Sequence, residues 1–191
     1  MKFFGAFALA ACLIPGLCSA GELNLATLTC SKYENEIVSS AGPGQKEDSI
    51  NVVMWLFGFA VAKSGAHVMY GGALPAFGFA LDKECKSSPS ESLLEAVPAI
   101  ALNKSNPMDL TTLDCGTFEA RHVESARSDP ESATTIMMWL FGYAVAQSGG
   151  HIFDTASVTR FASALQAQCA KDPAASLFET LTFLKTSKPW N

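Results

Sequence analysis

The sequence predicts an all-α protein of two tandem four-helix repeats, each stapled by a disulfide, that pack together as an internal pseudo-dimer. First, the thirteen residues WLFGFAVAKSGAH at 55–67 return 84 positions later as WLFGYAVAQSGGH at 139–151, with ten of thirteen identical. Second, each copy carries its own pair of cysteines. Third, helical periodicity dominates and few segments alternate as strands do. A period near 84 residues is far above the roughly 20 to 50 of solenoid units, so two small domains are expected.

A signal peptide is predicted at residues 1–20. Lys2 precedes an apolar stretch, and the small residues at 18–20 stand where signal peptidase cuts. A lipoprotein box at 9–12 is the alternative, although it leaves a shorter apolar region before the cut. The chain is therefore expected to be exported.

The exported chain is predicted to divide into a first repeat at 21–100, a linker at 101–107 and a second repeat at 108–191. The linker is short and polar and ends in a proline. Each repeat is about 80 residues long, a size at which a single core leaves little surplus stability.

Four cysteines remain after export, with spacings of 55 and 54 residues within the two repeats. An even number in an oxidising compartment favours disulfides, and zinc is disfavoured because paired short spacings such as C-x-x-C are missing. Three connectivities are possible. The repeat favours Cys30 with Cys85 and Cys115 with Cys169, and closing each loop is worth about 4 kcal/mol.

The first helix of each repeat is predicted around the leading cysteine, at 28–37 and 113–124. Turn residues at 39–44 and 125–130 then predict a loop. The central helix is expected to begin at a cap, Asp48 in one repeat and Asp129 with Pro130 in the other. It is expected to end at the glycines at 65 and 149–150.

The third helix carries a ridge of apolar residues at spacing four, which places them on one helix face. The ridge residues are Phe77, Leu81 and Cys85, and Phe161, Leu165 and Cys169. A fourth helix is predicted to begin at the cap-proline pairs 88–89 and 172–173, with Pro98 ending it in the first repeat. The tail at 186–191 is expected to be a loose end.

Two apolar runs, at 52–62 and 136–146, contain only apolar, aromatic or glycine residues. About 20 residues are needed to span a bilayer, so stable membrane insertion is not expected. A four-helix unit of this size can hardly cover such a helix on every side. Gly58 and Gly142 permit close approach, so the two runs are expected to pack together.

Ten residues of these runs are candidates for inter-repeat contact or client binding. The plain interpretation is core packing, and the functional one is a surface that binds other chains once the interface opens. They are Met54, Trp55, Leu56, Phe57, Phe59, Met138, Trp139, Leu140, Phe141 and Tyr143. The methionines would suit varied partners because their side chains adapt in shape.

His67 and His151 are the only histidines that repeat. Each follows a helix-ending glycine, so capping or local packing is the plain interpretation, and pH sensing is the functional one. His122 has no counterpart in the first repeat and is interpreted as a surface residue. No catalytic, metal-binding or cofactor-binding residues are predicted, since neither half contains a recognisable nucleophile, HExxH or phosphate-loop motif.

The net charge depends strongly on pH. After removal of Lys2 the chain has 12 basic and 18 acidic side chains, a formal charge of −6. The basic surface typical of a nucleic-acid-binding protein is therefore absent. With all carboxylates and the three histidines protonated the charge would be +15, so acid makes the protein strongly self-repelling.

A further pattern runs through both repeats. A cysteine has an aromatic residue three positions on (Cys30 and Tyr33; Cys115 and Phe118), then comes Trp-Leu-x-Gly-aromatic, then a cysteine with a proline four positions on. This order resembles the HdeA/HdeB family of periplasmic acid-stress proteins, once per repeat. The resemblance implies small helical domains in which a disulfide joins the first and third segments. Family members are typically single domains that pair, whereas here a linker joins two units.

The resemblance also implies a function, an ATP-independent periplasmic holdase that binds unfolded periplasmic proteins through apolar helix surfaces exposed at low pH. The central-helix residues around Trp55 and Trp139 are then candidate client contacts. The alternative is an exported, disulfide-stapled interaction protein, such as an inhibitor or immunity factor for one partner. An enzyme is not expected. The chain is expected to be a monomer with an internal pseudo-dimer, or a higher homo-oligomer.

Overall fold

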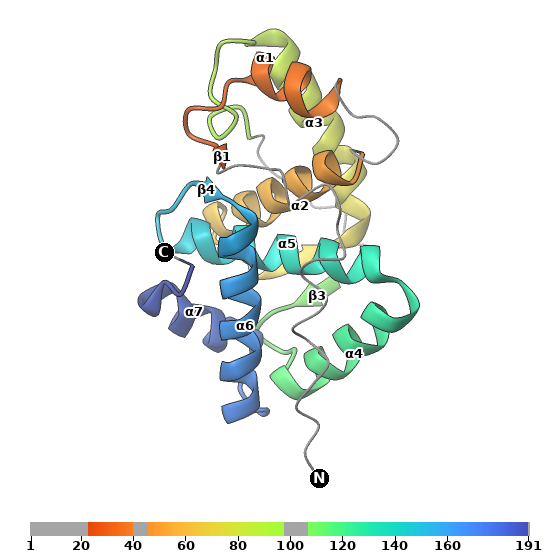
Figure 1. The fold of residues 1–191 in the computed structure, drawn as a ribbon, viewed down its shortest axis with the longest axis vertical. Helices are drawn as coiled ribbons and strands as arrows, with labels where there is room; N and C mark the ends of the chain where they lie inside the picture. Colours follow the sequence, from red (N-terminus) through yellow and green to blue (C-terminus); the bar gives the residue numbers. More distant parts are fainter. Residues whose placement is uncertain (1–22, 40–45, 98–106, 191) are drawn as a thin grey trace.

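Two long helices, α2 (Lys46–Lys63) and α5 (Pro130–Gln147), cross in the middle of the protein and separate its two ends (Figure 1). The computed structural model describes residues 23–39, 46–97 and 107–190. The predicted signal peptide and the predicted linker, apart from Pro107, lie outside these residues. The described chain is mostly helical, as the sequence predicts.

The first half places short elements around α2. They are β1 (Leu23–Asn24), α1 (Cys30–Lys32), the π-helix η3 (Tyr33–Val38), β2 (Val68–Tyr70), the 3₁₀-helix η4 (Gly71–Ala73) and α3 (Leu74–Ser87). The second half contains β3 (Pro107–Asp109), α4 (Cys115–Ser128), β4 (Ile152–Phe153), α6 (Thr155–Lys171) and α7 (Leu177–Ser187). In Figure 1, α1 and α3 lie at one end and α4, α6 and α7 at the other.

Two disulfides tie the outer helices within each half. One joins Cys30 to Cys85 and the other joins Cys115 to Cys169. The ridge residues on α3 and α6 are all buried, because the apolar face of each helix packs on the core beside its cysteine. This is the pairing that the sequence favours.

Among the residues described, four short strands pair between the two halves, and the sequence patterns did not predict them. In β1, Leu23 pairs with Phe153 of β4, and in β3, Met108 pairs with Met69 of β2, both antiparallel. The first strand of each half therefore pairs with a strand of the other half. Segments of two or three residues are too short to show an alternating pattern, so the sequence gives no signal for them.

The structure corrects the predicted fourth helix. In the first half, residues 88–97 form turns and a bend instead of a helix, and in the second half α7 begins at Leu177, later than Pro173. Ser176 caps α7 in a capping box with Glu179. Ser92 and Glu95 make the same bonds in the first half. Pro98 follows too soon there for a helix to continue, since proline lacks an amide donor and disfavours helix before it.

Other boundaries also move. The loop predicted at 125–130 is almost entirely helical, because α4 continues to Ser128 and Asp129 alone separates it from α5. Asp129 caps α5 and Pro130 opens it, as predicted. Helix α2 starts at Lys46, so Asp48 lies within the helix instead of before it. Most of the loop predicted at 39–44 lies outside the described residues.

The carboxyl-terminal tail is anchored, contrary to the expected loose end. Trp190 is buried against the rings of Phe141 and Phe161. Its carbonyl oxygen accepts hydrogen bonds from the Ser157 hydroxyl at 2.8 Å and from the Arg160 guanidinium at 2.6 Å. Trp190 itself is the signal that could have predicted this anchor. The free energy of burying a large aromatic ring offsets the entropy cost of ordering the tail.

Candidate functional site

The contact between α2 and α5, centred on Gly58 and Gly142, is the candidate site, and we call it the seam. A Cβ atom on Gly58 would lie 2.0 Å from the carbonyl oxygen of Trp139, and one on Gly142 would lie 2.0 Å from that of Trp55. The two backbones therefore touch, which only glycine permits at these positions. The close approach buries most of both apolar runs along the helix crossing, and Val53, Ile136 and Met137 are partly buried.

All ten candidate contact residues are buried, and none is more than 6% exposed. Trp55 stacks on Phe59 within its helix and meets Phe153 of the other half edge-on, with centroid distances of 5.3 and 6.4 Å. Trp139 lies against Tyr143, with ring centroids 5.7 Å apart. These aromatic residues therefore line the seam directly.

The other central aromatics point away from the seam into their own halves. Phe57 packs on Phe77 of α3, and Phe141 packs on Phe161 of α6. They build the two outer cores. Met54, Leu56, Met138 and Leu140 belong to the same continuous hydrophobic core. The sequence alone does not separate these groups, because the runs are apolar on every face.

Both seam tryptophans keep an unpaired polar group. The indole nitrogens Nε1 of Trp55 and Trp139 are buried and have no hydrogen-bond partner among the described residues. A buried donor left without an acceptor costs about 1 to 3 kcal/mol. The closed seam thus carries a penalty on each side that contact with water would remove.

The two repeated histidines differ in their surroundings. Nδ1 of His67 lies 2.9 Å from the Tyr143 hydroxyl of the other half, and its ring packs on Phe178 with centroids 4.4 Å apart. The first-half position equivalent to Tyr143 is Phe59, which has no hydroxyl to offer His151. The backbone is alike in both halves, since the carbonyls of His67 and His151 accept from Leu110 and Leu25 at 2.9 and 3.0 Å.

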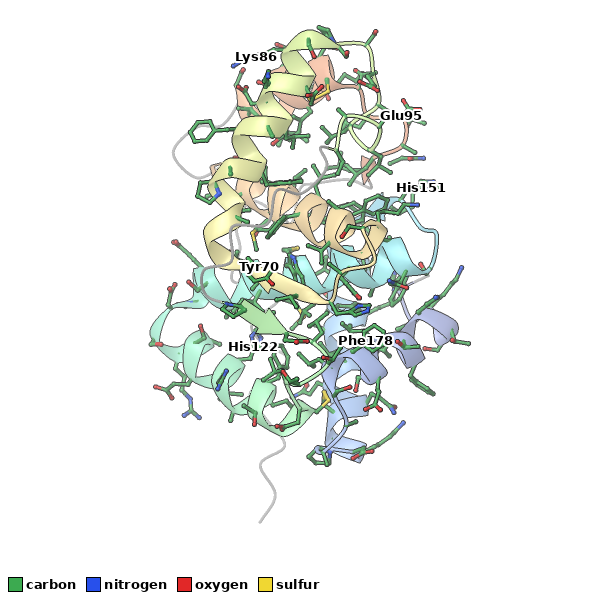
Figure 2. All side chains as sticks on the ribbon, turned by 180° about the vertical axis from the view of Figure 1, so that it is seen from behind. Tyr70, Lys86, Glu95, His122, His151 and Phe178 are labelled. Atoms are coloured by element: carbon green, nitrogen blue, oxygen red, sulfur yellow. A yellow bond between two sulfur atoms is a disulfide. The ribbon has the colours of Figure 1, made fainter. Side chains whose placement is uncertain are left out.

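His122 is half-buried, in contrast to its interpretation as a surface residue. Its ring stacks on Phe118, with centroids 5.5 Å apart and planes 14° from parallel. Figure 2 shows it beside the strand β3. It lines a pocket of about 480 Å³ together with Asp109 of β3 and Ile136 of α5. Burial lowers the pKa of His122, so the neutral form is favoured in the closed structure.

Aspartates cap three helices of the second half. Asp114 accepts from the Thr117 amide at 2.7 Å, Asp129 from Ser132 at 3.2 Å and Asp154 from Ser157 at 2.8 Å. The bonds to Thr117 hold the pKa of Asp114 below its usual range, and those to Ser132 do so for Asp129. Helix α1 is capped by Thr29 and α3 has no side-chain cap.

Charge pairing contributes little to the closed state. Within the described ranges the structure contains one ion pair, between Lys86 and Asp82 at 2.7 Å, and it lies on the surface. Exposed pairs are worth about 0 to 1 kcal/mol. Apolar packing of α2 on α5 and the strand pairs therefore hold the halves together, and each disulfide stabilises one half internally.

Neither a metal-ligand cluster nor a membrane-spanning helix lies within residues 23–39, 46–97 and 107–190. In these ranges no three His, Cys, Asp or Glu side chains gather as metal ligands. No helix there has the length and apolar character needed to cross a membrane.

The fold and seam define a class, a mostly helical protein with two disulfides and a large apolar surface closed between two helices. Comparison with known families identifies the class more closely, because the HdeA/HdeB family model matches residues 92–179. The chain is therefore HdeA/HdeB-like over this segment, which spans α4, α5 and α6 and the start of α7. No curated protein and no solved structure gives a significant match.

Proposed function

We propose that the protein is an ATP-independent periplasmic acid-stress chaperone, a holdase that binds unfolded periplasmic proteins through apolar helix surfaces exposed at low pH. The observation that carries the proposal is the seam, where the large side chains of Trp55, Phe59, Trp139 and Tyr143 are at most 6% exposed in the closed state. The family match supports the same function. No catalytic role is proposed.

The seam suits reversible opening. Burial of apolar side chains favours the closed state by about 25 cal/mol per Å² of apolar surface. Against this stand the two unpaired indole donors and, in acid, the repulsion of a chain whose charge rises from −6 toward +15. Acid therefore weakens the closed state, and opening exposes Trp55, Phe59, Trp139 and Tyr143 as a surface that can bind clients.

We further propose that residues 21–100 and 108–191 are two HdeA/HdeB-like repeats that form an internal pseudo-dimer, joined by the linker 101–107. The signal peptide at 1–20 would deliver the chain to the periplasm. Because the repeats are one chain, opening exposes the seam without separating the two halves. Reclosure at neutral pH is then independent of protein concentration.

The direct test is suppression of client aggregation. The mature protein is mixed with an acid-sensitive client at pH 2 to 4, and light scattering is followed. Suppression is expected, together with increased ANS binding and retained helical circular dichroism. An absence of suppression across this range excludes the holdase function.

A variant with an opened seam makes the test specific. Gly58→Ala places a methyl group against the Trp139 carbonyl and should open the seam at neutral pH, so that client protection appears without acid. Gly78→Ala is the matched control, because a Cβ atom there meets open space. An open Gly58→Ala protein that protects no client would show that the seam is not the client surface.

The dedicated interaction protein is the competing outcome. Affinity capture from periplasmic extract at neutral pH separates the two functions. Many clients captured only in acid support the holdase. One stoichiometric partner at neutral pH supports an inhibitor or immunity factor instead.

A further inference from the structure

We propose that the place between α5 and α6 that holds Trp190 is a peptide-binding site, occupied here by the protein's own chain. We call it the aromatic site, and it consists of Phe141, Phe161, Ser157 and Arg160. Its partner is an unfolded segment that carries a tryptophan or another aromatic residue. That this segment belongs to a client rests on the proposed function, whereas the site itself does not.

The aromatic end of the site is built from two rings of the core. Phe141 of α5 and Phe161 of α6 pack with their centroids 5.3 Å apart, and both are fully buried. The Trp190 indole meets each of them edge-on, at 6.1 and 5.9 Å, and is itself 5% exposed. Edge-on contacts between rings add to the free energy of simple burial, so this end favours an aromatic side chain over an aliphatic one.

The polar end of the site recognises main chain. The Trp190 carbonyl accepts from the Ser157 hydroxyl at 2.8 Å and from the Arg160 guanidinium at 2.6 Å. Every residue of a peptide carries such a carbonyl, so these two bonds suit segments of varied sequence. Ser157 is buried and Arg160 is exposed, which places this end of the site at the protein surface.

Contacts within α6 hold the polar end in place independently of Trp190. Asp154 caps the helix and accepts from the Ser157 amide at 2.8 Å. The Arg160 guanidinium also donates to the Ser157 hydroxyl oxygen at 2.9 Å, one turn away on the same helix. The site therefore keeps its donors when Trp190 leaves, and a site formed in advance binds at a smaller entropy cost.

The first half has the rings but not the polar end. At the 84-residue spacing of the repeated segment, Phe57 and Phe77 correspond to Phe141 and Phe161, and they pack at a similar distance of 5.2 Å. The residues that correspond to Asp154, Ser157 and Arg160 are Tyr70, Ala73 and Ala76. An outer core of this kind is thus built without the three polar residues, which indicates that they serve the peptide carbonyl.

A short segment, residues 188–190, holds Trp190 in the site, and we call it the strap. Two residues, Lys188 and Pro189, join Trp190 to the end of α7. Lys188 takes the left-handed conformation with φ of 42°, which a side chain disfavours. The strap is therefore strained, but its tether gives Trp190 an effective concentration on the order of millimolar at the site. A free peptide must compete with it.

The test is binding of a strap peptide to the full mature chain at pH 7. The probe is the acetylated and amidated peptide of residues 186–191, followed by isothermal titration calorimetry. Trp190→Ala empties the aromatic end and should bind the probe at least about tenfold more tightly than wild type, in which the strap competes. A probe with alanine in place of tryptophan should not bind. Equal affinities of wild type and Trp190→Ala overturn the proposal.

A second pair of variants keeps Trp190 and moves the strap. Proline needs a negative φ, so Lys188→Pro should turn the strap away from the site, whereas Lys188→Ala is the matched control that keeps it there. Lys188 is exposed, so both proteins should fold. Lys188→Pro should bind the probe more tightly than wild type does, and Lys188→Ala should bind it as wild type does. Dimers of Lys188→Pro that form through the freed Trp190 and exclude the probe would assign the site to a second copy and overturn the proposal.

A further substitution in the Trp190→Ala protein tests the polar end. Arg160→Ala should weaken probe binding by about tenfold or more, because a charged donor to the peptide carbonyl is lost. Arg127→Ala, at an exposed position of α4, is the control and should leave probe binding unchanged. Equal effects of the two substitutions would contradict the assigned site.

Client assays separate this inference from the proposed function. Probe binding to Trp190→Ala without any suppression of client aggregation in acid sinks the holdase function and leaves the site. Suppression of aggregation without probe binding to Trp190→Ala or Lys188→Pro sinks this inference alone.

Discussion

Gly58 lies directly against the carbonyl group of Trp139, so closely that a Cβ atom would stand 2.0 Å from the oxygen. The relation of Gly142 to Trp55 repeats this contact with the halves exchanged. The two helices meet at their backbones, and the surrounding aromatic rings fill the space on either side of this point. Several consequences can be measured.

Gly58→Ala should destabilise the protein by at least about 2 kcal/mol, because relieving a backbone clash costs more than the roughly 1 kcal/mol that alanine gains in helix propensity. Urea denaturation at pH 7 gives the value. Gly78→Ala on α3 gains the propensity without a clash and should be neutral or stabilising. Equal destabilisation of both variants would count against a seam held at this contact.

Tyr143→Phe should cost about 0.5 to 1.5 kcal/mol, since it removes the hydroxyl that bonds to His67 across the halves. It also makes the second copy of the repeated segment more like the first. A double-mutant cycle with His67→Gln isolates the pair. A coupling energy near zero would mean that the contact adds nothing to closure.

Alkaline pH should also weaken the closed state. Burial raises the pKa of Tyr143 to about 12. The folded protein therefore holds this proton more tightly than the unfolded chain does, and stability is lost as the pH rises from about 10 toward the folded pKa. Denaturation midpoints between pH 9 and 12 should fall less steeply in Tyr143→Phe. An unchanged slope would indicate that other groups carry the alkaline transition.

Asp129→Asn should flatten the acid limb of the stability curve. The pKa of Asp129 is held below its ordinary value of 3.8, so its contribution is full above that pH and is lost as the pH falls through the folded value. Asparagine keeps the cap without titrating, whereas Asp129→Ala loses the cap at every pH. Thermal midpoints from pH 6 to 2 compare the three proteins. Parallel curves for wild type and Asp129→Asn would refute this role.

Replacing Cys30 and Cys85 together by alanine should cost about 2 to 5 kcal/mol. The loss should concentrate in the first half, where the residues described at 88–97 form turns and no helix among them corresponds to α7. Hydrogen exchange should then show lost protection in α3 and retained protection in α6. The matched variant lacking Cys115 and Cys169 should reverse the pattern, and a uniform loss in either would argue that the halves unfold as one unit.

Sequence patterns predicted the elements whose signals are local and long. The apolar runs gave the central helices, the cysteine spacing gave both bridges, and Asp129 with Pro130 gave the start of α5. The aromatic and glycine content of the runs also indicated that they pack together. These features depend on periodicity or on cap chemistry, which a single sequence carries.

Features set by tertiary contacts were missed. His122 stands alone in the sequence, and its burial follows from β3 and α5 closing over α4. The crossed strands have too few residues to form a pattern. The repeat itself misled in one place: it suggested a fourth helix in both halves, but the described residues 88–97 form turns, and no helix among them matches α7. The partition of Phe57 and Trp55 between outer core and seam likewise depends on how the helices cross.

The strand pairs between the two halves also affect the order in which the protein folds. Leu23 pairs with Phe153, 130 positions along the chain, so a chain that folds as it emerges has no partner for its first strand until the second half exists. Such long-range contacts slow folding, because the entropy cost of closing the loop is incurred before the contacts form. Strand β1 is thus synthesised early but is among the last elements to pair, and the fold of the first half is incomplete until it does.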